Sequence, residues 1–182
     1  SAIGVQLDSL ADVITSGLAP AAVLWQVCLQ TEPCWLPEGW KLGYGVFVLA
    51  AFSALRLAKF NIDETQTVEF CGLPTPAGSL LCASLGMLWQ QGMLALSSDG
   101  VLLVAVLTSL LLVSPIRMFA LKFHGFGWRG NEVRYLFLLA SIVLIIILRT
   151  YAIPVIIVLY IVVSAVRWLC MRSGNPDKAP KA

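Results

Sequence analysis

The sequence predicts an all-α integral membrane protein, a polytopic bundle with about six transmembrane helices. Of its 182 residues, 59% are hydrophobic and 12% are charged, whereas soluble domains carry about 25% charged residues. The apolar residues form long runs separated by short polar joints, which is the pattern of helices that cross a bilayer. The length suits one domain, which we assign to residues 1–172, with a polar tail at 173–182.

Six apolar runs are the candidate spans. They are Val13–Leu29, Leu42–Leu57, Ala77–Leu96, Val101–Ile116, Val133–Leu148 and Ile153–Leu169. Most are shorter than the ~20 residues of a perpendicular span, so we expect the helices to extend into their polar flanks. Asp99-Gly100 predicts a tight turn between the third and fourth spans. The linker Arg117–Arg134 could itself contain a helix.

The placement of lysine and arginine predicts the orientation. With the N-terminus inside and alternating spans, ten of the twelve basic residues fall on the inner side and two, Lys41 and Arg149, on the outer side. The inner ten are Arg56, Lys59, Arg117, Lys122, Arg129, Arg134, Arg167, Arg172, Lys178 and Lys181. Since cytoplasmic loops carry the excess of basic residues, we expect an inner-membrane or equivalent location with the N-terminus in the cytoplasm. The net charge of +2 is too small to argue for nucleic acid.

An acidic pattern opens the chain. Gly4, Asp8 and Asp12 recur every four residues, so on a helix both carboxylates share one face, one turn apart. Like charges at this spacing repel each other and favour a bound cation, and oxygen ligands suit Mg²⁺, Mn²⁺ or Ca²⁺. The alternative is that the two aspartates only decorate a helix N-terminus, where negative charge is favourable. The spacing alone leaves both interpretations open.

This pattern resembles part of the signature of the CDP-alcohol phosphatidyltransferases, D-x2-D-G-x2-A-R-x8-G-x3-D-x3-D. Gly4, Asp8 and Asp12 match its last three fixed positions. The first half of the signature is absent from the sequence, and the resemblance assigns two further metal-binding carboxylates and much of the CDP contact to it. We therefore expect an N-terminally truncated domain that lacks activity by itself.

Later strings extend the resemblance from Gly4 to about Phe123. Ala54–Asn61 is similar to the family's A-L-R-L-A-R-F-N segment, Gly72–Pro76 to its G-L-P-x-P turn, and Ser114–Phe119 to its S-x-x-R/P-M-F segment. Together with Gly17–Pro20, these strings are most similar to the branch that uses serine.

The resemblance implies transfer of the phosphatidyl group of CDP-diacylglycerol to L-serine, which gives phosphatidylserine and CMP in phospholipid biosynthesis. It implies a divalent metal, Mg²⁺ or Mn²⁺, with Asp8 as a metal ligand. Asp12 would be the catalytic base and would also contact a second metal ion.

Gly4, Arg56, Asn61 and Arg117 are candidate substrate-binding residues on the same predicted side of the membrane, together with Lys122. Glycine leaves room for a ligand, and arginine binds carboxylate or phosphate groups. The asparagine side-chain oxygen can accept a hydrogen bond from an ammonium group. For Arg117 and Lys122, the alternative is ordinary anchoring on the cytoplasmic side.

Two other functions remain open at this stage. One is transfer to a different alcohol within the same family, and the other is a non-catalytic membrane scaffold or a transporter. A transporter usually places polar groups near the bilayer midplane, but the third span offers only Gln90 and Gln91, towards its outer end. Membrane lipids are expected partners, and a homodimer is left open.

Overall fold

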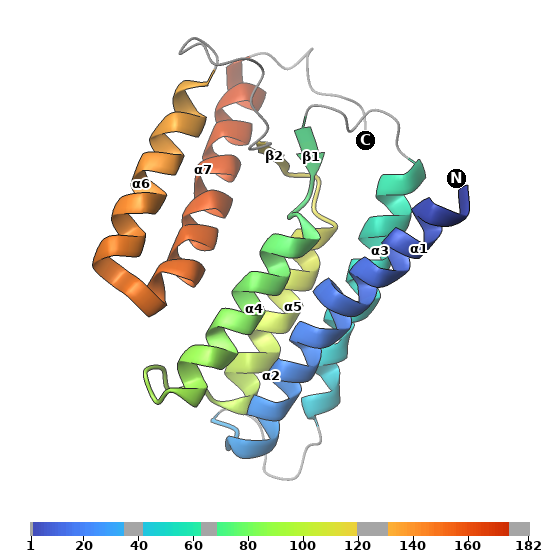
Figure 1. The fold of residues 1–182 in the computed structure, drawn as a ribbon, viewed down its shortest axis with the longest axis vertical. Helices are drawn as coiled ribbons and strands as arrows, with labels where there is room; N and C mark the ends of the chain where they lie inside the picture. The colour runs from blue at the N-terminus through green and yellow to red at the C-terminus, as the bar shows by residue number, and fades with distance from the viewer. Residues whose placement is uncertain (1, 35–41, 63–68, 120–130, 175–182) are drawn as a thin grey trace.

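A computed structural model describes residues 2–34, 42–62, 69–119 and 131–174 of the chain. Its first half contains α1 (Ala2–Asp12), the π-helix η1 (Val13–Leu18), α2 (Ala19–Gln30), the 3₁₀ helix η2 (Leu42–Phe47), α3 (Val48–Ile62) and β1 (Glu69–Cys71). Its second half contains α4 (Thr75–Gln90), α5 (Ser98–Leu112), β2 (Arg117–Phe119), α6 (Glu132–Leu148), the 3₁₀ turn η3 (Arg149–Tyr151) and α7 (Ala152–Gly174). Helices α1 to α5 form one bundle, and α6 and α7 form a hairpin beside it (Figure 1).

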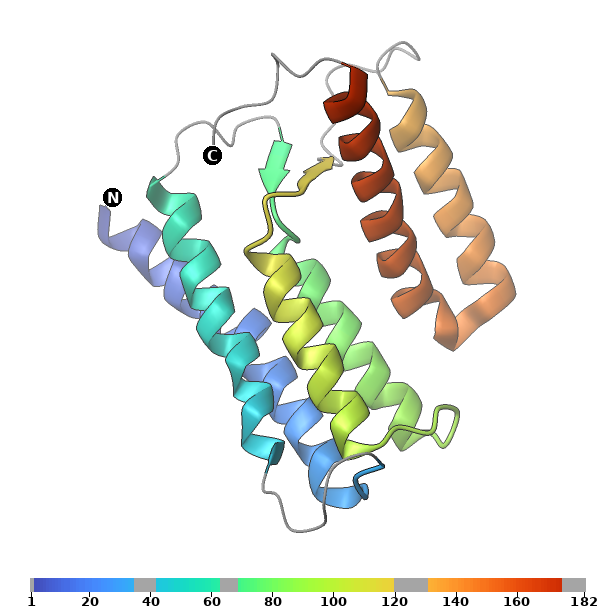
Figure 2. The same ribbon diagram turned by 180° about the vertical axis from the view of Figure 1, so that it is seen from behind.

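The all-α prediction is confirmed, with one short sheet added, and each predicted span overlaps a helical segment, although the number of membrane crossings stays a prediction. Within the described residues, three segments are long and apolar enough to cross a membrane: Ile3–Gln30, Gly43–Ile62 and Glu132–Met171. Ser98–Leu112 is a shorter apolar helix. The segment Glu132–Met171 includes two predicted spans, because the backbone at Arg149 takes φ 48° and α6 and α7 run antiparallel on either side of it (Figure 2).

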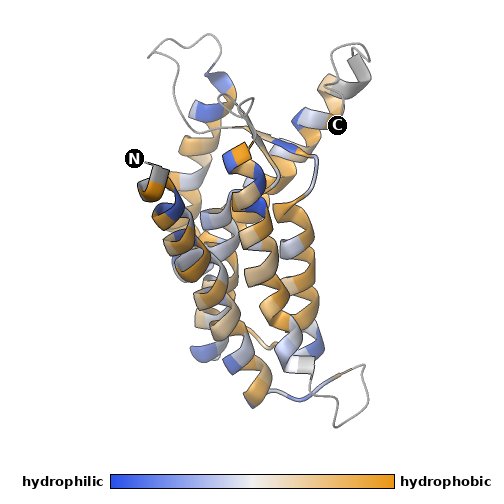
Figure 3. Cartoon of the chain, turned by 90° about the vertical axis from the view of Figure 1, so that its right-hand side faces the viewer, coloured by the Kyte–Doolittle hydropathy of each residue, from blue (hydrophilic) through white to orange (hydrophobic). Residues whose placement is uncertain are grey.

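The helix ends separate into two groups. The N-terminus of α1, the C-terminus of α3, the sheet, the start of α6 and the end of α7 lie at one end of the molecule (Figure 1). We call this the basic end, because Lys59, Arg117, Arg134 and Arg167 belong to elements that lie there or lead to it, whereas Arg149 lies in the turn at the other end of the α6–α7 hairpin. Polar residues gather at both ends of the helices and apolar residues between them (Figure 3). The polar ends and apolar middles of the helices agree with the alternating spans assumed in the orientation prediction.

The predicted turn at Asp99-Gly100 is wrong. Both residues lie in the first turn of α5, which Ser97 caps by accepting a hydrogen bond from the Gly100 amide at 3.3 Å. Asp99 is buried, and its carboxylate accepts a hydrogen bond from the Cys34 amide at 3.0 Å. A carboxylate at a helix N-terminus is favoured by the helix dipole, so the Asp-Gly pair begins a helix here instead of reversing the chain.

A two-stranded antiparallel sheet closes the basic end. Phe70 of β1 lies opposite Met118 of β2, and the Gly72 amide donates to the Ile116 carbonyl oxygen at 2.9 Å. Because β2 occupies the start of the linker in which a helix was considered, that helix does not begin at Arg117; residues 120–130 of the linker lie outside the described residues. The pairing satisfies backbone groups that would otherwise be costly to bury.

The core of the first bundle lies where α2, η2, α4 and α5 meet. Its fully buried side chains include Leu24, Val46, Cys82, Val101 and Ala105. The hairpin is joined to this bundle at two levels. Near the basic end, Phe119 packs against Phe137 and Tyr160, with ring centroids 5.6 and 4.9 Å away.

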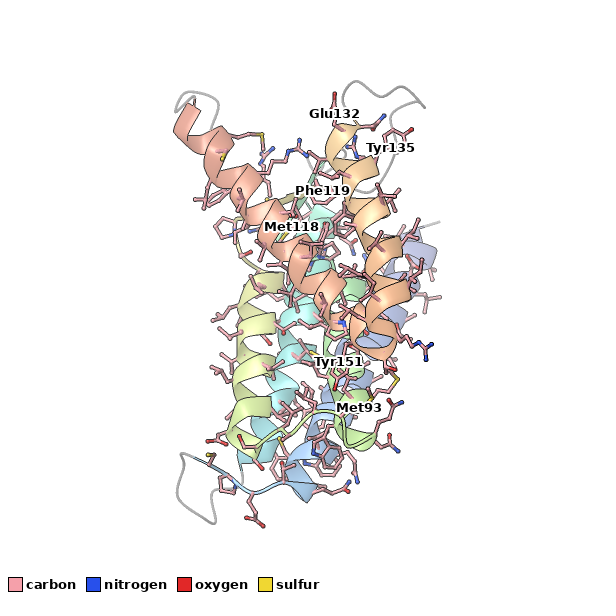
Figure 4. The ribbon with its side chains drawn as sticks, turned by 90° about the vertical axis from the view of Figure 1, so that its left-hand side faces the viewer. Met93, Met118, Phe119, Glu132, Tyr135 and Tyr151 are labelled. Carbon is pink, nitrogen blue, oxygen red and sulfur yellow. The ribbon has the colours of Figure 1, made fainter. Side chains whose placement is uncertain are left out.

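At the opposite end of the hairpin, the Tyr151 hydroxyl donates to the Met93 carbonyl oxygen at 2.7 Å. Figure 4 labels both of these residues at the lower end of the hairpin, with Met118 and Phe119 nearer its upper end. The hairpin is therefore held at the turn between its helices and again at Phe137 and Tyr160.

The turn between β1 and α4 gives a stability prediction. Gly72 has φ 76°, and a Cβ atom there would overlap the Leu112 carbonyl oxygen. We expect Gly72→Ala to lower the free energy of unfolding, measured in detergent, by more than ~1–2 kcal/mol. That amount is what a left-handed backbone alone costs a residue with a side chain.

Gly92→Ala is the matched control. Gly92 has φ 67° but nothing within 4 Å of the added Cβ, so only the backbone cost applies. Equal losses of unfolding free energy in the two variants would show that the overlap with Leu112 adds nothing to the backbone cost.

Candidate functional site

The acidic pattern forms one face of a helix, as predicted. Gly4, Asp8 and Asp12 all lie in α1, where Asp8 is exposed and Asp12, the last residue, is half-buried. The first turn of α1 contains no acidic residue, and the favourable effect of a helix N-terminus is lost beyond that turn. The alternative of two aspartates that decorate a helix N-terminus therefore does not fit this helix.

A π-helix begins immediately after Asp12. Such wide turns within α-helices are often found at functional sites. Gly17 of η1 packs against α3 so closely that a Cβ atom there would lie 2.9 Å from Ser53 Cβ and 3.2 Å from Ala50 Cα. The missing side chain at Gly17 thus lets η1 lie directly on α3, which brings Asp12 near the second half of that helix.

Arg56 is a buried residue of α3 whose side chain reaches the first residue of α4. Its exposed fraction is 8%, and its Nη1 donates to Thr75 Oγ1 at 2.6 Å. Its Nε has no hydrogen-bond partner among the described residues. The arginine therefore links the second half of α3 to the first residue of α4.

Asn61 lies at the exposed end of α3, and its Nδ2 donates to Ser9 Oγ at 2.9 Å. This bond joins the end of α3 to α1 next to Asp8. Asn61 therefore contacts α1 at the surface, whereas Arg56 of the same helix is buried and contacts Thr75 of α4.

Of the other candidate residues, Gly4 is exposed in α1, one turn before Asp8. Arg117 is half-buried in β2, opposite Cys71. Lys122 lies outside the described residues. The structure thus joins Asn61 to the helix that carries Asp8 and Asp12, and it places Arg117 on a separate element.

Sequence analysis missed two residues of this region, Thr75 and Tyr160. The Tyr160 hydroxyl donates to the Phe119 carbonyl oxygen at 2.9 Å. Thr75 lies inside the Gly72–Pro76 string, which was interpreted only as a turn. Tyr160 carried a weak signal, because a tyrosine inside an apolar run needs a hydrogen-bond partner for its hydroxyl.

The acidic face of α1 offers two carboxylates to a divalent cation. Within the described part of the chain, no group of three or more His, Cys, Asp or Glu side chains could hold a metal ion. Mg²⁺, however, is usually bound through one or two carboxylates, with waters and substrate phosphates as the other ligands. Asp8 and Asp12, one turn apart on one face, fit that mode of binding as a partial ligand set.

Comparison with known proteins gives the family. No family model matches the chain. The chain is 31% identical over 128 residues to the CDP-diacylglycerol–serine O-phosphatidyltransferase of Bacillus subtilis, an alignment that covers 69% of this chain and 63% of the relative. The enzyme of the same name from Mycobacterium tuberculosis is 34% identical over 197 residues, with coverage of 100% and 66%. The chain belongs to the CDP-alcohol phosphatidyltransferase family.

The match is partial in length. The chain spans 63% of the Bacillus subtilis relative and 40% of the Mycobacterium leprae relative, to which it is 37% identical over 127 residues. In this member of the family, the described site combines an exposed acidic face with a buried arginine behind it.

The hydrogen bond from Arg56 to Thr75 gives a second prediction. Thr75→Val keeps the side-chain shape but removes the acceptor of a buried cation, so we expect a loss of about 1–3 kcal/mol in unfolding free energy. Thr75→Ser retains the hydroxyl and should lower the unfolding free energy much less. If valine and serine are equally tolerated in unfolding measurements, the bond does not stabilise the fold.

Proposed function

We propose that this protein transfers the phosphatidyl group of CDP-diacylglycerol to L-serine and releases CMP. The observation that carries the proposal is the acidic face of Asp8 and Asp12 beside the buried Arg56, in a chain whose relatives are named CDP-diacylglycerol–serine O-phosphatidyltransferases. Serine and CDP-diacylglycerol come from those names, and membership of the family makes the same reaction class the first expectation here. Transfer to another alcohol remains an outcome of the test.

Asp12 suits the role of general base. In the reaction the serine hydroxyl oxygen forms a bond to the phosphatidyl phosphorus, the bond from that phosphorus to the CMP oxygen breaks, and the hydroxyl proton must leave. Asp12 is half-buried at the end of α1, and a carboxylate placed beside the bound substrate can take this proton.

Asp8 and Asp12 would hold a divalent cation, Mg²⁺ or Mn²⁺. When bound, this ion supplies positive charge that neutralises the pyrophosphate of the donor and the charge that develops on the departing CMP. Asp8 is exposed on the same face, so it can contribute ligand oxygens without losing contacts in the core.

Substrate binding is proposed for Gly4, Arg56, Asn61 and Arg117. Arg56 suits an oxyanion because its planar fork matches carboxylate and phosphate groups. Asn61, which is bonded to Ser9 beside Asp8, suits the hydrophilic part of a substrate at the surface. A homodimer stays a prediction.

We also propose that the six helical segments each cross the bilayer, with the basic end in the cytoplasm. The antiparallel arrangement in Figure 1 and the basic residues of the elements at one end support this topology. The acidic face would then lie at the cytoplasmic surface, where L-serine is available and the lipid donor is within reach.

Asp8→Asn and Asp12→Asn test the reaction. Each substitution removes charge and nearly preserves shape, so in full-length protein each should reduce CMP release by at least about 10²–10⁴-fold. Release of radiolabelled CMP from CDP-diacylglycerol with L-serine as acceptor provides the measurement.

Glu32→Gln is the matched control, because it neutralises an exposed carboxylate just after α2, at the far end from the sheet. It should keep full activity. Near-normal turnover in either aspartate variant would show that the reaction does not need that carboxylate. Rapid turnover of wild type with a different alcohol, but not with serine, would show that the acceptor is that alcohol.

Reporter fusions test the topology. A fluorescent protein fused after Ala182 should fold and fluoresce in the cytoplasm, whereas alkaline phosphatase inserted at the exposed Gly92 should be active only outside. A dark C-terminal fusion together with an inactive phosphatase would show that the orientation is the reverse. If both reporters proved to lie on the same side of the membrane, the predicted number of crossings would be wrong.

A further inference from the structure

Helix α1 carries both carboxylates of the acidic face, yet it is only lightly packed. None of its residues from Ile3 to Asp12 is buried. Leu7 and Leu10, on either side of Asp8, are each 60% exposed. Two carboxylates that share a cation need a set direction, because metal affinity depends on how the ligands are oriented. Whatever fixes the rotation of α1 about its axis therefore also fixes the direction of both carboxylates.

A hydrogen bond between side chains ties α1 to the end of α3. Asn61 Nδ2 donates to Ser9 Oγ at 2.9 Å, and Ser9 Oγ donates to the Val5 carbonyl oxygen, one turn earlier in α1, at 3.1 Å. Because the Ser9 proton is used within α1, this hydroxyl can only accept from Asn61, so the NH₂ group of the amide faces it. Hydrogen bonds arranged in such a chain polarise and strengthen one another.

A second contact holds the same two segments together eight residues away. A Cβ atom at Gly17 of η1 would lie 2.9 Å from Ser53 Cβ of α3, so the two backbones approach closely there. Ser9 precedes Gly17 by eight residues and Asn61 follows Ser53 by eight, which matches two helices that run antiparallel (Figure 1). In α3 these eight residues span about 12 Å. The acidic face of α1 lies along this stretch.

The bond at Ser9 sets the direction of the acidic face. Successive side chains of an α-helix are about 100° apart, so Asp8 and Asp12 point roughly 100° and 60° away from Ser9, both on the same side. Since Ser9 turns towards α3, the two carboxylates point to one side of the contact between α1 and α3, neither into it nor directly away from it. The exposed position of Asp8 and the half-buried position of Asp12 agree with this direction.

We propose that Ser9 and Asn61 are positioning residues for the metal site. Their hydrogen bond holds α1 against α3 at the rotation in which Asp8 and Asp12 bind a divalent cation together. This inference rests on the proposed function and deepens it, because it gives Ser9 a role and gives Asn61 a task apart from substrate binding. Neither residue needs to touch the ion. The loss of partners that orient metal ligands commonly costs about 10–100-fold in metal affinity or activity.

The experiment compares Ser9→Ala with Thr15→Ala in full-length protein. Thr15 is the matched control, because its hydroxyl is also exposed and donates one turn back, to the Ala11 carbonyl oxygen at 2.9 Å, but has no bond to α3 among the described residues. Binding of Mn²⁺ is measured by electron paramagnetic resonance in the presence of CDP-diacylglycerol and without serine, because phosphates of the donor complete the ligand set.

Ser9→Ala should raise the dissociation constant for Mn²⁺, and the Mg²⁺ concentration that half-saturates CMP release, about tenfold. Thr15→Ala should change neither value, and Ser9→Thr, which keeps the hydroxyl, should behave like wild type. Equal metal affinities in Ser9→Ala and Thr15→Ala would overturn the proposal.

The double variant of Ser9→Ala with Asn61→Ala tests whether Asn61 acts through Ser9. If it does, both single variants and the double variant raise the dissociation constant for Mn²⁺ by the same factor, because the same bond is lost in all three. Effects that multiply in the double variant would mean that the two residues act independently, and the positioning role of their bond would be wrong.

Hydrogen exchange of the α1 amides needs neither metal nor turnover. Loss of the bond should speed exchange in α1 of Ser9→Ala and of Asn61→Ala, but not of Thr15→Ala. If wild type releases no CMP with serine, the proposed function fails, whereas faster exchange together with weaker Mn²⁺ binding in both variants would still support the positioning role. Exchange that matches wild type in both variants overturns that role, whatever the activity.

Discussion

The need to satisfy backbone hydrogen bonds in an apolar medium shapes this molecule throughout. Inside a bilayer no water is available to amide and carbonyl groups, so the chain is helical wherever it crosses. Where it leaves the helix near α4, the Gly72 and Leu73 amides donate to the Ile116 and Leu111 carbonyl oxygens, each at 2.9 Å. Chemistry in such a protein must therefore come from side chains that project from rigid helices, and the acidic face of α1 is built in this way.

Against this background of satisfied polar groups, the junction around Arg56 is an exception. It holds a buried guanidinium whose hydrogen-bond partner is the Thr75 hydroxyl and whose Nε has no partner among the described residues. An unpaired polar group of this kind is unfavourable to bury. Under the proposed function, an oxyanion of a substrate would complete it.

The hairpin of α6 and α7 links the two halves of this arrangement. It contacts the first bundle through the aromatic group of Phe119, Phe137 and Tyr160 near the basic end and through the bond from Tyr151 to Met93 at the other (Figure 4). Contacts at Tyr151 and Tyr160 together limit the rotation of α7 about its axis. They bury Tyr160 against Phe119 of β2.

The sequence by itself determined the membrane class, the helical segments and the common face of Asp8 and Asp12, because helix formation and helical periodicity depend on residues close together in the chain. Asp99-Gly100 shows where local patterns were insufficient, since a pair typical of turns was placed inside a helix start by the cap from Ser97 and the contact with Cys34. Only the tertiary structure decided that Arg56 meets Thr75, that Gly17 lies on Ser53, and that the face of α7 with Tyr160 and Ser164 turns inward. The physical reason is that apolar helices expose similar surfaces to lipid and to each other, so hydrophobicity does not specify which faces pack together. That choice depends on small residues, hydrogen bonds and shape, which act between residues distant in sequence.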